Sequence, residues 1–272
     1  SYIGLPTGVH VDSSAFRKIP IDMKHREAWQ LASVPQGQDQ IFPYASLNND
    51  LRYGYGRARL AWYHIDPLFL RNTNLTPDHI RRDKDARSNH YVREVYEREI
   101  FPNKTPAYGE PTNLSVLNLA YYPTERGPYN FSTDLNQDGS LRNPRQNWAG
   151  IMRKIDTNDF EASNIDHIEF WLMDPFIYDQ GTHEGGYLYI NLGDISEDIL
   201  KDGRKFFEQG LPGPGEPFDV DSTVWGYIPK RQSMVNAFSN DPQTRLMQDV
   251  GLDGMNSEAE RRFLRQGNNA FL

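Results

Sequence analysis

The acidic stretch "DLNQDGSL", residues 134–141, has the residue types of a calcium-binding loop. Loops of the EF-hand type carry oxygen ligands at their first, third and fifth positions, and glycine at the sixth position allows a sharp turn. Here Asp134, Asn136 and Asp138 supply the three oxygen-bearing side chains, and Gly139 follows them. The stretch therefore matches the first half of a calcium site.

The second half of the loop does not match. Arg142 stands at the ninth position and Arg145 at the twelfth, where a calcium loop needs a bidentate glutamate. Asp-Gly between strand-like segments is also a strong hairpin signal by itself. We therefore predict a polar connection that ends in an Asp-Gly turn. The alternative is a structural Ca²⁺ on Asp134, Asn136 and Asp138, with further oxygen ligands from outside the loop.

Common enzyme signatures are missing from the sequence. It has no cysteine, no GxSxG nucleophile motif, no HExxH zinc motif and no P-loop, and the seven histidines have no pair at metal-ligand spacing. Glu169 and Asp174 lie near Trp171 and have the chemistry for glycoside hydrolysis. With 37 acidic residues in the chain, such pairs arise by chance. We predict that the chain is not an enzyme, has no catalytic residues and holds no cofactor.

Two segments, residues 165–175 and 185–194, alternate in polarity as strands do. One face of this alternation is aliphatic and aromatic. The other face combines aromatic and polar side chains, namely His167, Glu169, Trp171, Tyr187, Tyr189 and Asn191. If the two strands pair, this second face is an aromatic platform with polar edges, a kind of surface that binds sugars or partner proteins. The alternative is that another layer of the same chain, such as residues 1–60, covers it.

The elements before residue 102 are predicted from proline positions and apolar periodicity. A strand-like run over residues 58–70 should end at Asp66-Pro67, because proline lacks a backbone donor. Residues 76–101 are predicted to be helical, with Thr76-Pro77 at the N-terminus. A second helix is predicted to begin at Ser88 and to bury an apolar stripe.

From about residue 112 the pattern changes to strands. A short helix is predicted after them, with Asp194 and Glu197 at capping-box spacing. A last helix is predicted to start at Ser257 and to run to about Gln266. The tryptophans outside the aromatic face are predicted to anchor the core or its rim: Trp62, Trp148 and Trp225.

The composition favours a packed, mainly β protein. The 272 residues include 15 Tyr and 14 Phe, and the 21 Gly and 18 Pro suit many short strands joined by turns. We predict a jelly-roll-like β-sandwich over residues 108–230, similar to galactose-binding and carbohydrate-binding modules. Residues 1–107 would form an irregular and helical flanking region. Residues 231–272 would form a C-terminal extension of loop and helix.

Net charge limits the classes of partner. The formal net charge of -8 argues against nucleic acid and anionic membranes, because proteins that bind them usually carry a basic patch. No stretch approaches the roughly 18 consecutive apolar residues of a membrane helix.

Long phrases between about residues 60 and 260 carry a family resemblance. They include "SNHYVREVYEREIFPN", "LNLAYYPTERGPYN", "IDHIEFWLMDPF", "GGYLYINLGDISEDILKDGRKFFEQGLP" and "QDVGLDGMNSEAE". In these phrases the chain resembles the SprA family, also called Sov. These are very large cell-surface proteins of gliding motility and type IX secretion in Bacteroidetes.

The resemblance implies a parent protein that is an outer-membrane β-barrel translocon, through which folded cargo leaves the periplasm. The chain would be a soluble fragment or insertion domain of that parent, in the cell envelope at the outer membrane or cell surface. The implied partners are the translocon barrel, its accessory outer-membrane proteins and secreted cargo, and not nucleic acid. The alternative function is a carbohydrate-binding module that recognises surface polysaccharide.

Overall fold

The computed structural model describes residues 23–105, 108–109, 112–155, 159, 161, 168, 170–178, 181, 185–203, 220–229, 240–248, 256–258 and 261–262. The chain divides into two compact units. Unit 1 comprises Ser1–Gln30, Ala61–Tyr121 and Arg153–Leu188, and unit 2 comprises Leu31–Leu60, Tyr122–Met152 and Tyr189–Leu272. Each unit is therefore assembled from segments that lie far apart in the sequence. The predicted boundaries at residues 107 and 230 stay a prediction.

The helices and strands of the described residues are short. The 3-10 helices are η1 (Arg26–Ala28) and η2 (Leu51–Gly54), and the α-helices are α1 (Pro67–Leu70), α2 (Asp78–Arg82), α3 (Lys84–Ser88), α4 (Glu97–Ile100) and α5 (Pro242–Met247). The strands are β1 (Gln30–Leu31), β2 (Ala58–Tyr63), β3 (Val95–Tyr96), β4 (Asn113–Leu114), β5 (Asn118–Arg126), β6 (Ile151–Met152), β7 (Val220–Thr223) and β8 (Gly226–Pro229).

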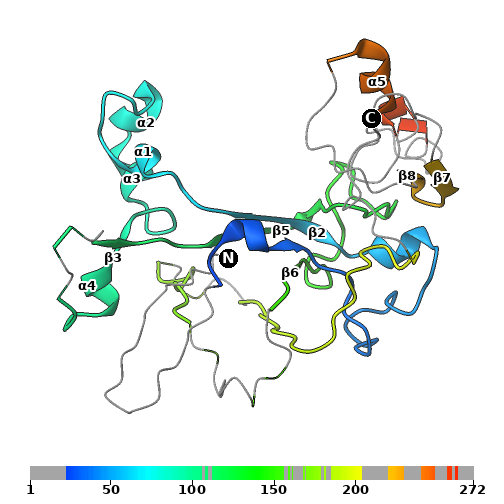
Figure 1. The fold of residues 1–272 in the computed structure, drawn as a ribbon, viewed down its shortest axis with the longest axis horizontal. Coiled ribbons are helices and arrows are strands. Elements are labelled where there is room, and N and C mark those ends of the chain that lie inside the picture. Colours follow the sequence, from blue (N-terminus) through cyan, green and yellow to red (C-terminus); the bar gives the residue numbers. More distant parts are fainter. Residues whose placement is uncertain are drawn as a thin grey trace. The chain divides into compact units, whose positions relative to one another are not determined.

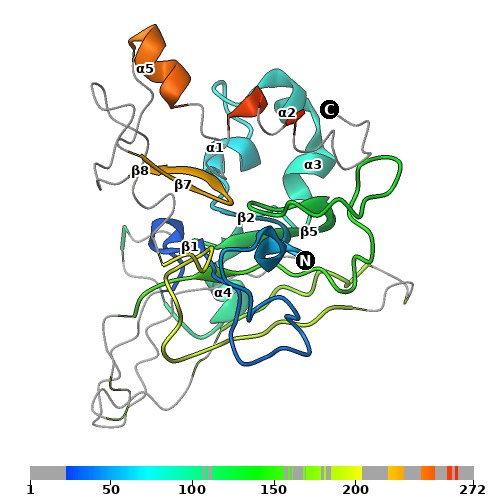
Figure 2. The ribbon, with the colours of Figure 1, turned by 90° about the vertical axis from the view of Figure 1, so that its right-hand side faces the viewer.

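The sheets in the described residues have two strands each and join β1 to β6, β2 to β5, β3 to β4 and β7 to β8. The long strands β2 and β5 lie side by side in Figure 1. The β3–β4 and β7–β8 pairs are antiparallel, and the β7–β8 hairpin is seen clearly in Figure 2. The prediction of a mainly β chain is correct at this coarse level, because the described chain is mostly non-helical. A sandwich needs two sheets packed face to face, and the described residues do not form one. Among the described residues, no helix is long and apolar enough to span a bilayer.

The core of unit 2 is built from aromatic and aliphatic side chains of distant segments. Trp225 is fully buried there, and its ring packs against the rings of Tyr129 and Phe131. The other buried members of this cluster are Val34, Phe42, Ala45, Tyr53, Met152, Ile199 and Leu200. Trp225 is therefore a core anchor, as predicted.

Arg57 lies buried beside this core and carries a positive charge. Its guanidinium donates one hydrogen bond, from Nη1 to the carbonyl oxygen of Ala32 at 2.7 Å, and lies 4.8 Å from the centre of the Trp148 ring. Burial lowers the pKa of Arg57 to about 10, so the group stays charged at neutral pH. The Arg57 carbonyl accepts hydrogen bonds from the backbone of Gly127 and the side chain of Asn130, which ties two segments of unit 2 together.

Short capped helices replace the first part of the helical region predicted in unit 1. Asp66 caps α1 by accepting a hydrogen bond from the backbone of Leu68 at 2.8 Å, and Asp83 caps α3 in the same way through Ala86 at 2.8 Å. The residue before α2 is Pro77, which has no capping side chain.

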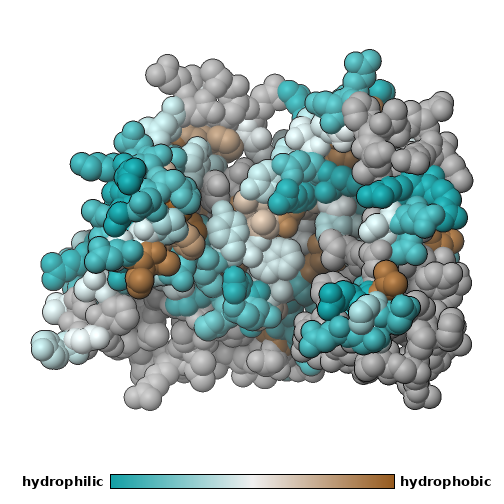
Figure 3. Space-filling view, turned by 90° about the horizontal axis from the view of Figure 1, so that it is seen from above, coloured by the Kyte–Doolittle hydropathy of each residue, from teal (hydrophilic) through white to brown (hydrophobic). Residues whose placement is uncertain are grey.

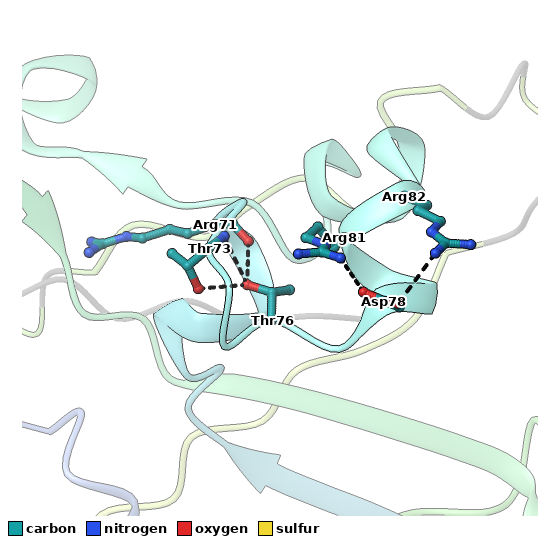
Figure 4. Close-up of polar contacts among 6 residues, drawn as sticks. All are labelled: Arg71, Thr73, Thr76, Asp78, Arg81 and Arg82. Atoms are coloured by element: carbon teal, nitrogen blue, oxygen red, sulfur yellow. Dashed lines mark hydrogen bonds and ion pairs between the residues drawn. The ribbon is translucent and has the colours of Figure 1, made fainter.

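The predicted cap at Thr76 is therefore wrong. The buried Thr76 hydroxyl instead lies 2.8 Å from the Arg71 carbonyl oxygen and accepts a hydrogen bond from the Thr73 backbone, which closes the turn between α1 and α2 (Figure 4). The carboxylate of Asp78 forms ion pairs with Arg81 and Arg82, which lie one helical turn further along α2 (Figure 4).

The predicted second helix over residues 88–101 is also wrong. Residues 95–96 form β3, in which Val95 pairs with Leu114 and Tyr96 with Asn113, and only Glu97–Ile100 is helical. β-branched and aromatic side chains favour strands, so pairing with residues distant in sequence overrides the helical period here.

The helix predicted to begin at Asp194 is absent from the described residues up to 203. Lys201 and Gly203 have φ angles of 55° and 79°, which a right-handed helix cannot contain. Asp198 instead accepts hydrogen bonds from the backbones of Asp202 and Gly203, which stabilises a tight turn. In the predicted last helix, residues 257–258 and 261–262 are helical, and the other residues of that prediction lie outside the described chain.

Candidate functional site

The six residues of the predicted aromatic platform have different placements. His167 and Glu169 lie outside the described residues. Trp171 and Tyr187 belong to unit 1, whereas Tyr189 and Asn191 belong to unit 2. The Asn191 side chain accepts a hydrogen bond from Gln38 Nε2 at 2.9 Å. The structure therefore does not gather the four described residues within one unit.

The strand prediction that supported this platform is wrong for the described residues. Residues 170–173 and 186–192 do not form strands there. The opposite, aliphatic face is as open as the aromatic one, since Leu188 is about as exposed as Tyr189. Alternation alone does not create a strand when no neighbouring chain pairs with it.

An exposed aromatic surface is nevertheless present in unit 1. We define it by two groups of rings, of which Trp171 and Tyr178 are the exposed members: His90, Tyr91 and Tyr178 in one group, and Phe101 and Trp171 in the other. The centres of the Trp171 and Phe101 rings are 6.5 Å apart, and those of the Tyr178 and His90 rings are 4.8 Å apart. Both pairs are arranged edge to face. Trp171 is 53% exposed and Tyr178 is 76% exposed. Apolar side chains also reach the molecular surface at several separate places in Figure 3.

Hydrogen bonds fix the segment that carries the two exposed rings. The Tyr91 hydroxyl donates to the Pro175 carbonyl oxygen at 2.6 Å. Asp174 accepts a hydrogen bond from the backbone of Phe176 at 2.8 Å and so stabilises the turn between Trp171 and Tyr178. The surface thus presents two rings that are largely open to solvent, Trp171 and Tyr178, on a segment that hydrogen bonds hold in place.

A charged group positions the neighbouring element α4. Both oxygens of Glu99 accept hydrogen bonds from the Arg93 guanidinium, at 3.0 and 2.8 Å, and the Tyr96 backbone N–H donates to Glu99 at 2.9 Å. The hydrogen bonds from Arg93 lower the pKa of Glu99 below its ordinary value. The carboxylate therefore stabilises the start of α4 in its ionised form.

We expect Glu99→Ala to open this end of α4. Exchange of the Tyr96 amide hydrogen should quicken about fivefold at neutral pH, since a lost capping interaction costs about 1 kcal/mol. The difference should be present above the ordinary glutamate pKa of about 4.3 and should vanish as the pH falls through the lowered pKa. Glu161→Ala is the control, because Glu161 is exposed and makes no hydrogen bond or ion pair with the described residues. Equal exchange in both variants would contradict this role.

The stretch "DLNQDGSL" forms a hairpin in unit 2. Leu135 and Leu141 are bridged in an antiparallel manner, and Gly139 has a φ of 81°, which favours glycine. Asp138 Oδ1 accepts hydrogen bonds from the backbone and hydroxyl of Ser140, at 3.0 and 2.6 Å, and the hydroxyl hydrogen bond lowers the pKa of Asp138. The predicted Asp-Gly turn is confirmed.

The candidate calcium ligands of this hairpin already have partners within it. Asp134 pairs with Arg142 at 3.2 Å, and the Asn136 side chain donates to the Ser140 hydroxyl at 2.9 Å. Across the described chain, no three His, Asp or Glu side chains come together as a metal site would require.

We therefore expect millimolar calcium, or removal of divalent ions by a chelator, to leave the melting temperature unchanged. A ligand that binds only the folded state raises the melting temperature by mass action. Thermal unfolding with and without calcium checks this. A saturable rise that Asp134→Asn abolishes would show instead that the hairpin binds the ion.

Comparison with models of known protein families finds no match to this chain, and neither does comparison with curated proteins. The described geometry offers two exposed aromatic rings, Trp171 and Tyr178, as contact groups for a partner. The pair of Glu169 and Asp174 has one member outside the described residues. Sequence reasoning found Trp171 but missed His90, Phe101 and Tyr178. The Asp-Pro pair after Trp171 signalled the turn that contains Tyr178.

Proposed function

We propose that the chain is a non-catalytic extramembrane part of a type IX secretion translocon, acting in protein export across the outer membrane and in gliding motility. The observation that carries this proposal is the exposed aromatic surface of unit 1. The family resemblance of the sequence supplies the biological setting. The partners are the translocon barrel, its accessory outer-membrane proteins and exported cargo.

Physical chemistry supports a contact role for such a surface. Tyr and Trp are enriched in protein interfaces, where they dominate binding energies, because each buries a large area at low entropic cost. Water covers much of Trp171 and Tyr178 in this chain, so covering them with a partner gains free energy. Exposed rings held by Tyr91 and Asp174 also lose little freedom on binding.

The fold of the parent region is part of the same proposal. A jelly-roll-like sandwich over residues 108–230 is the fold that we propose for this region. A polar, aromatic sandwich suits weak contacts with many cargo proteins.

Deletion of this segment from the parent protein tests the proposal. The expected result is loss of cargo from the culture medium and loss of gliding, with the parent still present in the outer membrane. Intact secretion and motility after deletion would overturn it.

The second candidate function is glycan binding, favoured by the open ring of Trp171, since aromatic rings stack on sugar faces. A glycan array probed with the 272-residue chain, and with Trp171→Ala and Tyr189→Ala, tests it. Binding to a surface polysaccharide that either variant weakens would support it. No binding to any glycan would remove this candidate.

A further inference from the structure

A second exposed apolar segment lies in unit 2, at Tyr189–Leu192. Tyr189, Ile190 and Leu192 are 52%, 53% and 52% exposed, so water reaches side chains on both sides of the segment. The backbones of Ile190 and Leu192 make no hydrogen bond with any residue that the structure describes. In an extended chain, residues two apart direct their N–H and C=O groups to the same edge. Ile190 and Leu192 therefore offer open backbone donors and acceptors, which share one edge when the segment is extended.

The segment is anchored to the body of unit 2. Gln38 donates to the Asn191 side chain at 2.9 Å, and the Ser33 hydroxyl donates to the Ser196 carbonyl oxygen at 2.6 Å. Ile199 and Leu200, a few residues further on, are buried in the core. An open edge that is anchored at its C-terminal end loses less conformational entropy on pairing than a free chain does. Its four residues equal β7 and β8 of the same unit in length, and those strands do pair.

Acidic side chains follow and flank this edge. Residues 189–198 contain Asp194, Glu197 and Asp198 and no Lys or Arg, which gives the stretch a formal charge of -3. Exposed Asp39 stands next to Gln38, the residue that bonds to Asn191. Lys201 is the nearest cation along the chain, and its Nζ donates to Gln36 Oε1 and the Ala45 carbonyl oxygen. The stretch that contains the edge therefore has a negative formal charge.

We propose that Tyr189–Leu192 is a docking edge for an extended strand of another polypeptide, with apolar side chains at alternate positions and lysine or arginine at its ends. Main-chain hydrogen bonds to Ile190 and Leu192 supply the pairing, as in β-strand addition. The apolar side chains cover the exposed ones on the edge, and the basic ends meet Asp39 and Asp194. A second copy of this chain is a poor occupant, because two acidic stretches on chains of net charge -8 repel each other.

Two synthetic peptides test the proposal on the 272-residue chain. Both alternate valine and threonine, and one ends in paired lysines while the other ends in paired glutamates. The lysine peptide is expected to bind at least about tenfold more tightly by fluorescence anisotropy, with an advantage that shrinks as salt rises. It should also slow hydrogen exchange at the amides of Ile190 and Leu192. Equal binding of the two peptides, or no binding of either, would overturn the proposal.

A pair of variants separates main-chain pairing from apolar contact. Leu192→Pro removes the backbone donor on the edge, whereas Leu192→Thr keeps the donor and shortens the apolar side chain. We expect Leu192→Pro to weaken binding of the lysine peptide at least about tenfold more than Leu192→Thr does. Equal affinities of the two variants would show that the backbone is not paired, against the proposal. So would dimers in analytical ultracentrifugation that Leu192→Pro abolishes, because the occupant would then be a second copy.

Discussion

Replacing Trp225 by alanine is expected to cost unit 2 about 3–5 kcal/mol of unfolding free energy, the range for deleting a buried large aromatic side chain. Trp225 has no exposed surface and packs against the rings of Tyr129 and Phe131. These neighbours come from a different segment of the chain, so they cannot refill the space without moving their own backbone. Total stabilities of domains are only about 5–15 kcal/mol, and a loss of this size removes a large share.

Urea unfolding followed by far-ultraviolet circular dichroism measures this loss. Trp171→Ala is the matched control, because it is the same substitution on a half-exposed ring, and we expect it to cost less than about 1 kcal/mol. Equal costs for the two variants would show that Trp225 is not in the core.

The second large effect is expected at Gly54. A methyl group on this residue would lie 2.0 Å from the carbonyl oxygen of Tyr129, closer than any real side chain approaches a backbone atom. Tyr129 has a φ of 59°, a conformation uncommon for tyrosine, so the opposing backbone has little room to adjust. We expect Gly54→Ala to cost about 3 kcal/mol, at the upper end of the overpacking range.

Thermal unfolding measures this cost, and a loss of this size lowers the melting temperature by roughly 6–12 °C. Gly186→Ala is the control, since no atom lies within 4 Å of the added methyl group and its φ is outside the left-handed region. We expect that control to leave the melting temperature within about 3 °C. A melting temperature of Gly54→Ala that matches the control would contradict the close approach.

Local chemistry made some elements predictable from the sequence. Strand β2 ends at Tyr63, shortly before the Asp-Pro pair at residues 66–67, and Asp66 caps α1. The Asp-Gly pair at residues 138–139 formed its turn. In each case the residues that determine the structure are neighbours in sequence, so a short window contains the cause.

Elements that depend on distant pairing were mispredicted. The apolar period over residues 91–100 suits a helix, but Val95 and Tyr96 pair with residues 113–114. The alternation over residues 186–192 suits a strand, but the structure forms none there. The period of apolar residues indicates which side chains are to be buried, but it does not identify the segment that buries them. For the candidate site, this meant that Trp171 was found from the alternation of its own segment, whereas His90 and Tyr178 required the fold.

The most direct test of the account is secretion by cells whose parent protein carries Trp171→Ala and Tyr178→Ala together. Tyr108→Ala is the control, because Tyr108 is fully exposed and lies outside the aromatic surface. If the surface binds translocon partners or cargo, the double variant should lower the amount of exported protein in the medium about tenfold or more, as expected for loss of interface anchors. The control should leave export unchanged. Equal export by the double variant and the control, with equal amounts of parent protein in the outer membrane, would contradict the account.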